Sequence, residues 1–467
     1  IMHIKYDNNS EFTHPNSAIK WVDNKTYLTG KIKVDNLRPN TKYFYQVWFS
    51  SPDNGTNSSA VLGSFRTVPN PSSSNNSISF IIGADIGGQG FCREVKDGYL
   101  IFEKMKSLLP DFYIQNGDMI YAINNCPKDR PDGGQNIPGN FSGIADSNVD
   151  WKNEALVHDT YLKHWSYNRA DPHLQAFLGN TSMYMQWDDH EVINDFGSKW
   201  SYWNSLNKNR TGYQDLVQAG RETFFNFSPI ERNQQDPDRI YRSFHWGKDM
   251  DLLILDARSY RSRNDLPDIK QNNKTLLGDD QLSWLKETLA NSNATWKIIS
   301  SDVPMSIPTG SNASLFGRDG WANGINRDFS SKTGFERELW DLMKFIDDHD
   351  IDNVVFVTTD AHFPAILKYN ADVNGDGDSV NVYEIVCGPL SAIPFGIPGI
   401  PLPKFDPTFQ PTILYVDGGI FNFAYFKINK GSDGLMHLTT SIIGEDGNPR
   451  YGSVIDLRPN QNTNQNE

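Results

Sequence analysis

Short runs of apolar residues, each closed by a polar turn, recur along the middle of this chain and predict buried β-strands. Two such runs, at residues 78–82 and 112–115, flank a segment at 93–109 whose apolar residues follow a helical spacing. A strand–helix–strand unit of this kind builds a pair of parallel strands. This pattern is typical of an α/β sheet. Further strands are predicted at 182–186, 251–255, 297–301 and 353–357, helices at 154–167, 279–290 and 335–346, and mainly strands from residue 380 to residue 456.

The first 68 residues show a different pattern, in which apolar and polar residues alternate and predict an all-β unit. A turn over residues 35–43 leads into Tyr43, as at the tyrosine corner of immunoglobulin-like sandwiches. This unit resembles a fibronectin type III domain, but too few strands are readable, so we expect it to be partly trimmed. A linker rich in Pro, Ser and Asn follows it. The predicted organisation is a β-domain at 1–68, a linker at 69–77, the main domain at 78–457 and a disordered tail at 458–467.

Composition and charge narrow the class of protein. The net charge of −14 argues against a surface that binds nucleic acid or an anionic membrane. The three cysteines, Cys92, Cys126 and Cys387, allow at most one disulfide. No apolar run approaches the roughly 18 residues of a membrane-spanning helix. No signal peptide is visible, and we interpret the start at Ile1 as that of a trimmed mature form. Abundant Asn, Ser and Thr with few Cys lead us to expect an extracytoplasmic protein, whether secreted, periplasmic or on the cell surface.

Six of the predicted strands are each followed by an acidic residue. Asp118 shows the pattern most clearly, because it follows the turn Asn116–Gly117 that closes the strand at 112–115. For Asp118 alone, a capped turn with a solvated carboxylate is the simpler interpretation. Several uncompensated carboxylates at one sheet edge are costly unless cations neutralise them, so the set predicts a polynuclear metal site. The acidic strand ends are Asp85, Asp118, Asp188 with Asp189, Asp256, Asp302 and Asp360.

Four longer segments match one family, in the order in which that family carries them. They are Asn116-Gly-Asp-Met-Ile-Tyr121, Gln186-Trp-Asp-Asp-His-Glu-Val192, Leu255-Asp-Ala-Arg-Ser-Tyr-Arg-Ser262 and Thr359-Asp-Ala-His362. They resemble the alkaline phosphatase D (PhoD-type) enzymes of the calcineurin-like metallophosphoesterase superfamily. The small N-terminal β-domain also fits this family and the purple acid phosphatases. Lesser matches, within a resemblance that runs from about residue 78 to residue 365, are at 171–175, 239–244, 277–285 and 295–298.

The resemblance implies a fold and an activity. The fold is an α/β (α+β) four-layer αββα metallophosphoesterase sandwich, in which two mixed sheets pack face to face with helices outside. The activity is hydrolysis of a small-molecule phosphate ester, a monoester, a diester or both, by in-line attack of a metal-bound hydroxide. His190, as an imidazolium, would protonate the leaving alkoxide or stabilise its charge. The alternative for His190 is a helix-start residue bonded to the backbone.

The same resemblance assigns metal ligands residue by residue. Metal one would take Asp85, Asp118, Tyr121 and His362, and metal two would take Asp118, Asp189, Asp302 and Asp360. Many members of the family have a cysteine in place of Asp85, which here stands in an Asp-x-Gly segment like that of purple acid phosphatases. The phenolate, carboxylates and imidazole of metal one suit Fe³⁺. Asp302 replaces the usual amide, so metal two has only carboxylates, which favour Ca²⁺ and otherwise Mn²⁺, Mg²⁺ or Zn²⁺.

The charges of this ligand set do not balance. The acidic groups of the two metal sites carry six negative charges when ionised, against five positive charges from a ferric and a divalent ion. Either a further divalent ion, such as a second Ca²⁺, sits nearby, or Asp302 is not a ligand. Arg258 and Arg261 are candidates for positive charge beside the substrate, because guanidinium groups match phosphate oxygens in pairs. The alternative for Arg258 is a brace that pairs with Asp256 or Asp188.

A separate segment, residues 372–378, has the spacing of the start of an EF-hand-type calcium loop. No Glu stands at the twelfth position of the loop, where Tyr383 is found. The segment also lies between strand-like runs and not between helices, so the alternative is a bare polar turn. The candidate ligands of a structural Ca²⁺ are Asp372, Asn374, Asp376 and Asp378.

A second class of function stands beside hydrolysis. The chain could be a non-catalytic, calcium-dependent binding or adhesion protein on the same fold. That hypothesis predicts degraded site residues, whereas the acidic strand ends and His190 are all in place. We therefore favour the enzyme.

Overall fold

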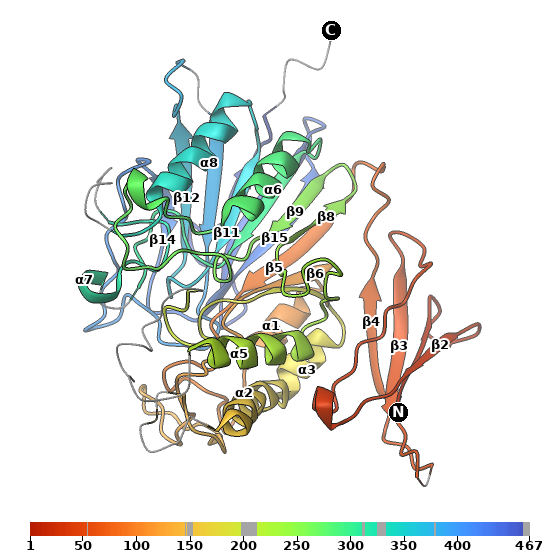
Figure 1. Cartoon of the computed structure of the whole chain (residues 1–467). Coiled ribbons are helices and arrows are strands. Elements are labelled where there is room, and N and C mark those ends of the chain that lie inside the picture. Colours follow the sequence, from red (N-terminus) through yellow and green to blue (C-terminus); the bar gives the residue numbers. More distant parts are fainter. Residues whose placement is uncertain are drawn as a thin grey trace.

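The computed structural model describes residues 1–53, 55–144, 146, 153–197, 213–310, 313–324, 333–377 and 380–460. Its strands form three sheets, and helices cover the outer faces of the two larger ones (Figure 1). The two larger sheets pack face to face around a shared apolar core. The predicted αββα sandwich is therefore confirmed. Residues 461–467 of the predicted tail lie outside the described residues.

The first large sheet carries the predicted strand–helix–strand unit. Its strands β5, β6 and β7 run parallel, and the remaining three strands are antiparallel to their neighbours. In order across the sheet the strands are β17 (Ile455–Leu457), β16 (Met436–Gly444), β15 (Asn422–Lys430), β5 (Ile78–Gly83), β6 (Phe112–Asn116) and β7 (Ser182–Gln186).

The second large sheet also has a parallel centre, formed by β9, β10, β11 and β13. Strands β8, β12 and β14 are antiparallel to their neighbours. In order across the sheet the strands are β14 (Thr412–Val416), β12 (Ala365–Ala371), β13 (Val380–Val386), β11 (Val354–Thr358), β10 (Trp296–Ser301), β9 (Met250–Ile254) and β8 (Arg242–Trp246).

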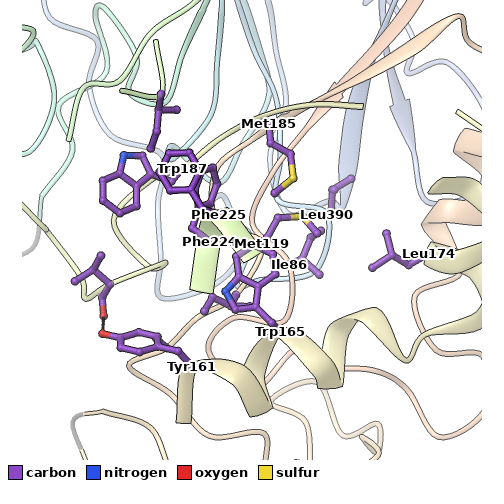
Figure 2. Close-up of a cluster of buried hydrophobic side chains, with 14 of the residues drawn as sticks. Ile86, Met119, Tyr161, Trp165, Leu174, Met185, Trp187, Phe224, Phe225 and Leu390 are labelled. Atoms are coloured by element: carbon purple, nitrogen blue, oxygen red, sulfur yellow. Dashed lines mark hydrogen bonds between the residues drawn. The ribbon is translucent and has the colours of Figure 1, made fainter. Parts of the chain in front are cut away.

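Aromatic side chains fill both faces of the first large sheet. Between the sheets, the ring of Phe80 lies 4.5 Å from that of Phe426 and 4.9 Å from that of Phe112. On the outer face, Trp165 and Phe224 pack with Met185 (Figure 2). Burying each large apolar side chain contributes about 1.5–3 kcal/mol, so both faces hold the sheet in register. The helices on this side are α1 (Ile101–Ser107), α2 (Glu154–Arg169), α3 (Pro172–Leu178) and α5 (Tyr213–Phe227).

The helices of the other outer layer, α6 (Asp279–Ala290) and α8 (Glu336–Asp348), pack on the second large sheet. Three shorter elements are α7 (Ala313–Phe316) and the 3₁₀ turns η1 (Asn24–Thr26) and η2 (Lys270–Asn272). The pattern of apolar residues predicted the exact first and last residues of α6 and β7. For the other strands whose ranges were predicted, each end differs by at most one residue. The helix expected at 93–109 is shorter, because Val95 instead bonds the backbone of Gln135. No helix among the described residues is both long and apolar enough to cross a bilayer.

The N-terminal unit is one antiparallel sheet in the order β2 (Asn16–Lys20), β1 (Met2–Asp7), β3 (Lys42–Phe49) and β4 (Val61–Arg66). The backbone N–H of Arg38 donates to the Tyr43 hydroxyl at 3.0 Å, which is the contact of a tyrosine corner. The N-terminal unit docks on the main body, where Lys31 Nζ donates to the carbonyls of Phe225, in the last turn of α5, and of Ile230, just after it. The fibronectin III-like assignment and the domain boundaries remain predictions.

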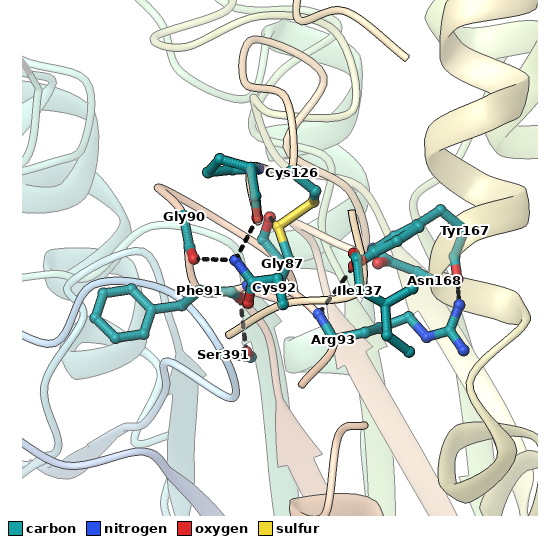
Figure 3. Close-up of a disulfide and its surroundings, with 12 residues drawn as sticks. Gly87, Gly90, Phe91, Cys92, Arg93, Cys126, Ile137, Tyr167, Asn168 and Ser391 are labelled. Carbon is teal, nitrogen blue, oxygen red and sulfur yellow. Dashed lines mark hydrogen bonds between the residues drawn. A yellow bond between two sulfur atoms is a disulfide. The ribbon is translucent and has the colours of Figure 1, made fainter. Parts of the chain in front are cut away.

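One disulfide, Cys92–Cys126, ties the loop after β5 to the long loop before α2 (Figure 3). Arg93 lies beside it, and its guanidinium donates to the carbonyl of Tyr167 in α2. On the other side, the Ser391 hydroxyl donates to the carbonyl of Phe91 at 2.8 Å. The disulfide and these two hydrogen bonds together fasten the segment that follows Asp85 to the loop before α2, to α2 itself and to the loop at 389–411. The third cysteine, Cys387, is free and buried.

We predict that the disulfide stabilises the fold in oxidising solution. The two cysteines are 34 residues apart, and closing a loop of that length stabilises by about 3–4 kcal/mol in the chain-entropy model. In urea, the free energy of unfolding should fall by this amount, relative to oxidised wild type, in two cases. One is wild type with reductant, and the other is the Cys92→Ser/Cys126→Ser variant without reductant. The variant should not respond further to reductant. Wild-type stability that is the same with and without reductant would contradict this prediction.

Candidate metal centre

The parallel strands of both large sheets deliver acidic side chains to one region between the sheet ends. Asp85, Asp118 and Asp360 each come two residues after a strand, at the ends of β5, β6 and β11. All three have left-handed φ angles, of 63°, 50° and 65°. Such backbone costs of order 1 kcal/mol or more for a non-glycine residue and persists only where neighbouring contacts hold it. The chain thus adopts an unfavourable conformation at the points where these carboxylates converge.

Two glycines make room for these carboxylates. Gly117 has a φ of 87°, and a Cβ at this position would lie 2.3 Å from the Cβ of Asp188. Gly388 has a φ of 95°, and a Cβ there would lie 2.4 Å from Asp85 Oδ2. A larger residue at either place would displace an acidic side chain.

The first group of candidate ligands comprises Asp85, Tyr121 and His362. The Tyr121 hydroxyl lies 3.3 Å from Asp85 Oδ1 and 2.9 Å from His362 Nε2. His362 Nδ1 lies 2.6 Å from the carbonyl of Ile393, which can only accept, so Nδ1 carries the proton. The lone pair of Nε2 is then directed at the tyrosine and the aspartate, as in a metal-ligating histidine.

The second group contains Asp118, Asp189 and His190, each offering a ligand atom within 4.8 Å of the others. Asp118 Oδ1 accepts a bond from the backbone N–H of His190 at 3.1 Å. The ring of His190 stacks on Tyr121 at 4.0 Å between centroids and therefore joins the two groups. Burial lowers the pKa of His190 to about 4, despite Asp189 nearby. Burial therefore opposes the imidazolium form expected for His190 from the sequence.

The carboxylates of both groups, and the neighbouring Asp360, have buried oxygens without a hydrogen-bond partner. They are Asp85 Oδ2, Asp118 Oδ2, Asp189 Oδ1 and Asp360 Oδ2. Burial, and then the charge of Asp189, raise the pKa of Asp85 to about 8 and that of Asp118 well above its usual range. Burial thus disfavours the ionised forms of Asp85 and Asp118, which bound cations would favour. A hard, oxygen-rich donor set of this kind fits Fe³⁺, Ca²⁺, Mn²⁺ or Mg²⁺.

Arg258 brings positive charge to the centre from the inside of the protein. Its guanidinium is fully buried and forms ion pairs with Asp188, with Asp302 at 3.2 Å and with Asp319 at 2.6 Å. Arg261 is also fully buried and pairs with Asp319 at 2.8 Å. This placement favours a structural role, in which Arg258 braces carboxylates, over direct contact with a substrate. Asp188 was an expected partner of Arg258, whereas Asp302 was not.

Asp256 and Asp302 differ from the other acidic strand ends. Asp256 Oδ1 accepts bonds from the indole N–H of Trp187 and from the backbone of Arg258, which makes it the cap of its own turn. Asp302 Oδ1 accepts from the backbone N–H of Ala257, and Arg258 lies beside its Oδ2. Asp256 is therefore a structural residue, while Asp302 already has a positive partner.

Sequence reasoning missed a further group, Asp189, Asp195 and Asp319, whose oxygens also lie within 4.8 Å of one another. The backbone N–H of Asp195 donates to Asp189 Oδ2 at 2.5 Å. Asp319 stands in a long loop far along the chain, and no local pattern connects it with the centre. Only the folded structure brings these residues together.

A cavity of about 250 Å³ opens on the centre and is large enough for a small organic molecule. It is lined by four residues of the centre, Asp189, His190, Asp360 and His362. Neither lysine nor arginine is among the described residues that line it. Its remaining lining is neutral apart from Asp195, and consists of Gln89, Asn194, Ile307, Pro308, Thr309, Gly310, Ala361, Phe395 and Pro403.

The predicted calcium loop is a hairpin between β12 and β13. Asp372 accepts bonds from the backbone N–H groups of Gly375 at 2.7 Å and Gly377 at 3.2 Å. Asn374 Oδ1 accepts from the backbone N–H of Asp376 at 3.0 Å. These bonds are those of a polar turn. The fourth candidate ligand, Asp378, lies outside the described residues, so Ca²⁺ binding here stays a prediction.

Three comparisons relate this chain to known proteins. A model of the PhoD-like phosphatase family matches residues 84–406. Alkaline phosphatase D of Bacillus subtilis (strain 168) is 24% identical over 348 residues, which cover 71% of this chain and 52% of that protein. The chain thus spans about half the length of this curated relative. A solved structure, "Structure of PhoD", is 17% identical, with a TM-score of 0.71 over 99% of this chain and 86% of that one, and shows the shared fold. By the extent of the family match, the chain belongs to the PhoD-like phosphatase family.

Proposed function

We propose that this chain hydrolyses small-molecule phosphate esters with the help of metal ions. The observation that carries the proposal is the set of buried carboxylate oxygens without partners around Tyr121 and His362. Such a set is unfavourable on its own and becomes favourable when cations bind. Family membership supports the reaction class, and the cavity of about 250 Å³ supports a small substrate, either a monoester or a diester.

The ligand chemistry supports a ferric ion beside a divalent ion. Asp85, Asp118, Tyr121 and His362 would hold Fe³⁺. Asp118, Asp189 and Asp360 would hold the divalent ion, for which carboxylates favour Ca²⁺, with Mn²⁺, Mg²⁺ and Zn²⁺ as alternatives. Bound cations would neutralise the phosphoryl oxygens and lower the pKa of a water molecule at the site toward neutrality.

The ion pair with Arg258 bears on the charge deficit of the predicted ligand set. Because Arg258 lies 3.2 Å from Asp302 Oδ2, the charge of that carboxylate is offset without a metal. This supports the alternative in which Asp302 is not a ligand. The group of Asp189, Asp195 and Asp319 supports the other alternative, a further Ca²⁺ beside the main pair. Counting metal ions per chain decides between them.

The chain's own residues would position the substrate and handle the proton. His190 lines the cavity, and its Nε2 lies 3.9 Å from Asp189 Oδ1. Stacking on Tyr121 holds the imidazole on the same side as the candidate ligands. We assign His190 the proton that the leaving oxygen must receive, a role worth about 10²–10⁴-fold in rate. Arg258 and Arg261 would act from behind the centre by fixing Asp188, Asp302 and Asp319.

Glu191 would act as a positioning residue for both ligand-bearing loops. Its carboxylate accepts backbone N–H bonds from Asp118 at 3.0 Å, Met119 at 2.6 Å and Asp188 at 2.8 Å. The first two donors follow β6 and the third follows β7, so one side chain fixes two strand ends. Hydrogen bonds to a buried charged acceptor contribute about 1.5–3 kcal/mol each.

An extracytoplasmic location follows as part of the proposal. The disulfide Cys92–Cys126 supports it, because disulfides persist mainly in oxidising compartments.

We predict that His190→Ala lowers kcat/KM by about 10²–10⁴-fold, since it removes the proton donor while leaving the carboxylates intact. Asp118→Asn should cost at least as much, because Asp118 belongs to both candidate ligand sets. Hydrolysis of p-nitrophenyl phosphate and of its bis ester measures both losses. The matched control is Glu287→Gln, on the exposed face of α6. Wild-type rates in both site variants would refute the proposed function.

We predict that the purified protein absorbs visible light through a tyrosinate–Fe³⁺ charge-transfer band, and that Tyr121→Phe removes the band. Mass spectrometry should find one iron and at least one divalent ion per chain, and exhaustive chelation should abolish hydrolysis. More than two metal ions per chain would support the further Ca²⁺, and two would exclude it. A band that persists in Tyr121→Phe would show that another group binds the iron.

We predict that Glu191→Gln weakens metal retention and lowers the free energy of unfolding by about 1.5–3 kcal/mol, because an amide cannot accept all three N–H bonds. The measurements are metal content after dialysis against a weak chelator and urea unfolding. Glu287→Gln again serves as the control for loss of a surface charge. If Glu191→Gln matches wild type in both measurements, Glu191 does not position the loops.

A further inference from the structure

A second cavity, of about 480 Å³, lies where the N-terminal unit meets β8 and α6. It shares no lining residue with the cavity over the candidate metal centre. Four of its described lining residues, Lys33, Arg232, Arg239 and Arg242, are basic, and Glu231 is acidic. In a chain with a net charge of −14, such a concentration of positive charge at one place is unusual and points to an anion.

The carboxylates nearby do not neutralise this charge. Glu231 pairs with Lys33 at 3.1 Å in an exposed contact. Asp238 lies 3.2 Å from Arg232 but is shared with Arg221, which is 2.9 Å away. Exposed pairs of this kind are weak and exchange readily with a ligand.

Arg239 and Arg242 form no ion pair within the described part of the chain. Arg242 donates to the carbonyls of Ile240 and Met185, both at 2.7 Å, and these carbonyls orient the guanidinium without cancelling its charge. Burial lowers the pKa of Arg242 to about 10, so it stays charged at neutral pH. Arg239 likewise donates to the carbonyl of Tyr241 at 3.1 Å.

Aromatic rings make Arg239 rigid. Its guanidinium lies 3.9 Å from the ring centroid of Tyr241 and 5.7 Å from that of Trp284. Stacking uses the face of the guanidinium and leaves N–H donors along its edge, which is the edge that pairs with phosphate oxygens. These residues come from segments 239–244 and 277–285, which match the family but supply no candidate metal ligand.

We propose that this cavity is a second anion site, which takes a phosphate group between Arg239, Arg242 and Lys33. The site is independent of the proposed hydrolysis, because it needs neither the metal centre nor its cavity. The ligand is either free inorganic phosphate or the phosphate group of an organic molecule.

The test counts phosphate on the metal-loaded protein by equilibrium dialysis with radiolabelled inorganic phosphate. Wild type should bind two phosphates per chain, and Arg239→Gln/Arg242→Gln should bind one. Arg458→Gln is the matched control, since it removes an exposed arginine that pairs with Asp433, and it should still bind two. A double variant that binds as many phosphates as wild type would overturn the proposal, whatever the wild-type count.

A second variant keeps the test valid if the double variant does not fold. Lys33→Gln removes an exposed side chain and should weaken the second phosphate about threefold, as expected for one surface charge. Unchanged affinity in Lys33→Gln would contradict the proposed position. Phenylphosphonate, which is not hydrolysed as an ester, separates the two sources of the group. If phenylphosphonate displaces the second labelled phosphate at lower concentrations than unlabelled phosphate does, the ligand is an organic phosphate. If unlabelled phosphate is the better competitor, the ligand is free phosphate.

The phosphate count and the rate of hydrolysis report on different sites. A protein without hydrolytic activity that still binds phosphate in an Arg239-dependent way would refute the proposed hydrolysis and support the second anion site. An active protein whose phosphate count is the same in wild type and in the double variant would do the opposite.

Discussion

Repulsion between buried carboxylates is the constraint on which the centre of this protein depends. Asp85, Asp118 and Asp189 are buried, Asp360 is partly exposed beside them, and each keeps an oxygen without a hydrogen-bond partner. In such surroundings like charges cannot all be ionised without positive charge beside them. The left-handed backbone at three of these residues shows that the chain is strained where they meet. Cation binding would therefore stabilise the fold as well as enable the chemistry.

Arg258 divides the acidic residues into two classes. Asp188, Asp302 and Asp319 face its guanidinium, which offsets part of their charge. The carboxylates that pair with neither Arg258 nor Arg261 depend most on cations. A lysine could not replace Arg258, because a single ammonium group lacks the planar fork that reaches three carboxylates at once. Buried ion pairs contribute little net stability, so the benefit of this one lies in fixing which oxygens remain free.

Features that depend on a local sequence pattern could be predicted from the sequence. Apolar runs closed by turns located the strands, and the residues after them located most of the acidic centre. The helix α3 was missed although Asp171 and Pro172 mark its start, and the structure confirms Asp171 as its N-cap. Asp195 and Asp319 could not be predicted, because their closeness to Asp189 depends on loops far apart in the chain. The role of Arg258 stayed open for a related reason, since burial decides between a brace and a substrate contact.

The two concentrations of arginine in this acidic chain differ in what they can do. Arg258 and Arg261 are fully buried, and both already pair with carboxylates. An external anion could reach them only by displacing those carboxylates, at the full cost of leaving buried charges unpaired. Arg239 and Arg242 border an open cavity and bond mainly to carbonyls, which hold the guanidinium groups in place and leave their charge available. Arginine thus braces carboxylates at the candidate metal centre, whereas at the second cavity it can receive an anion. The difference lies in the hydrogen-bond partners, which are carboxylates in the first case and carbonyls in the second.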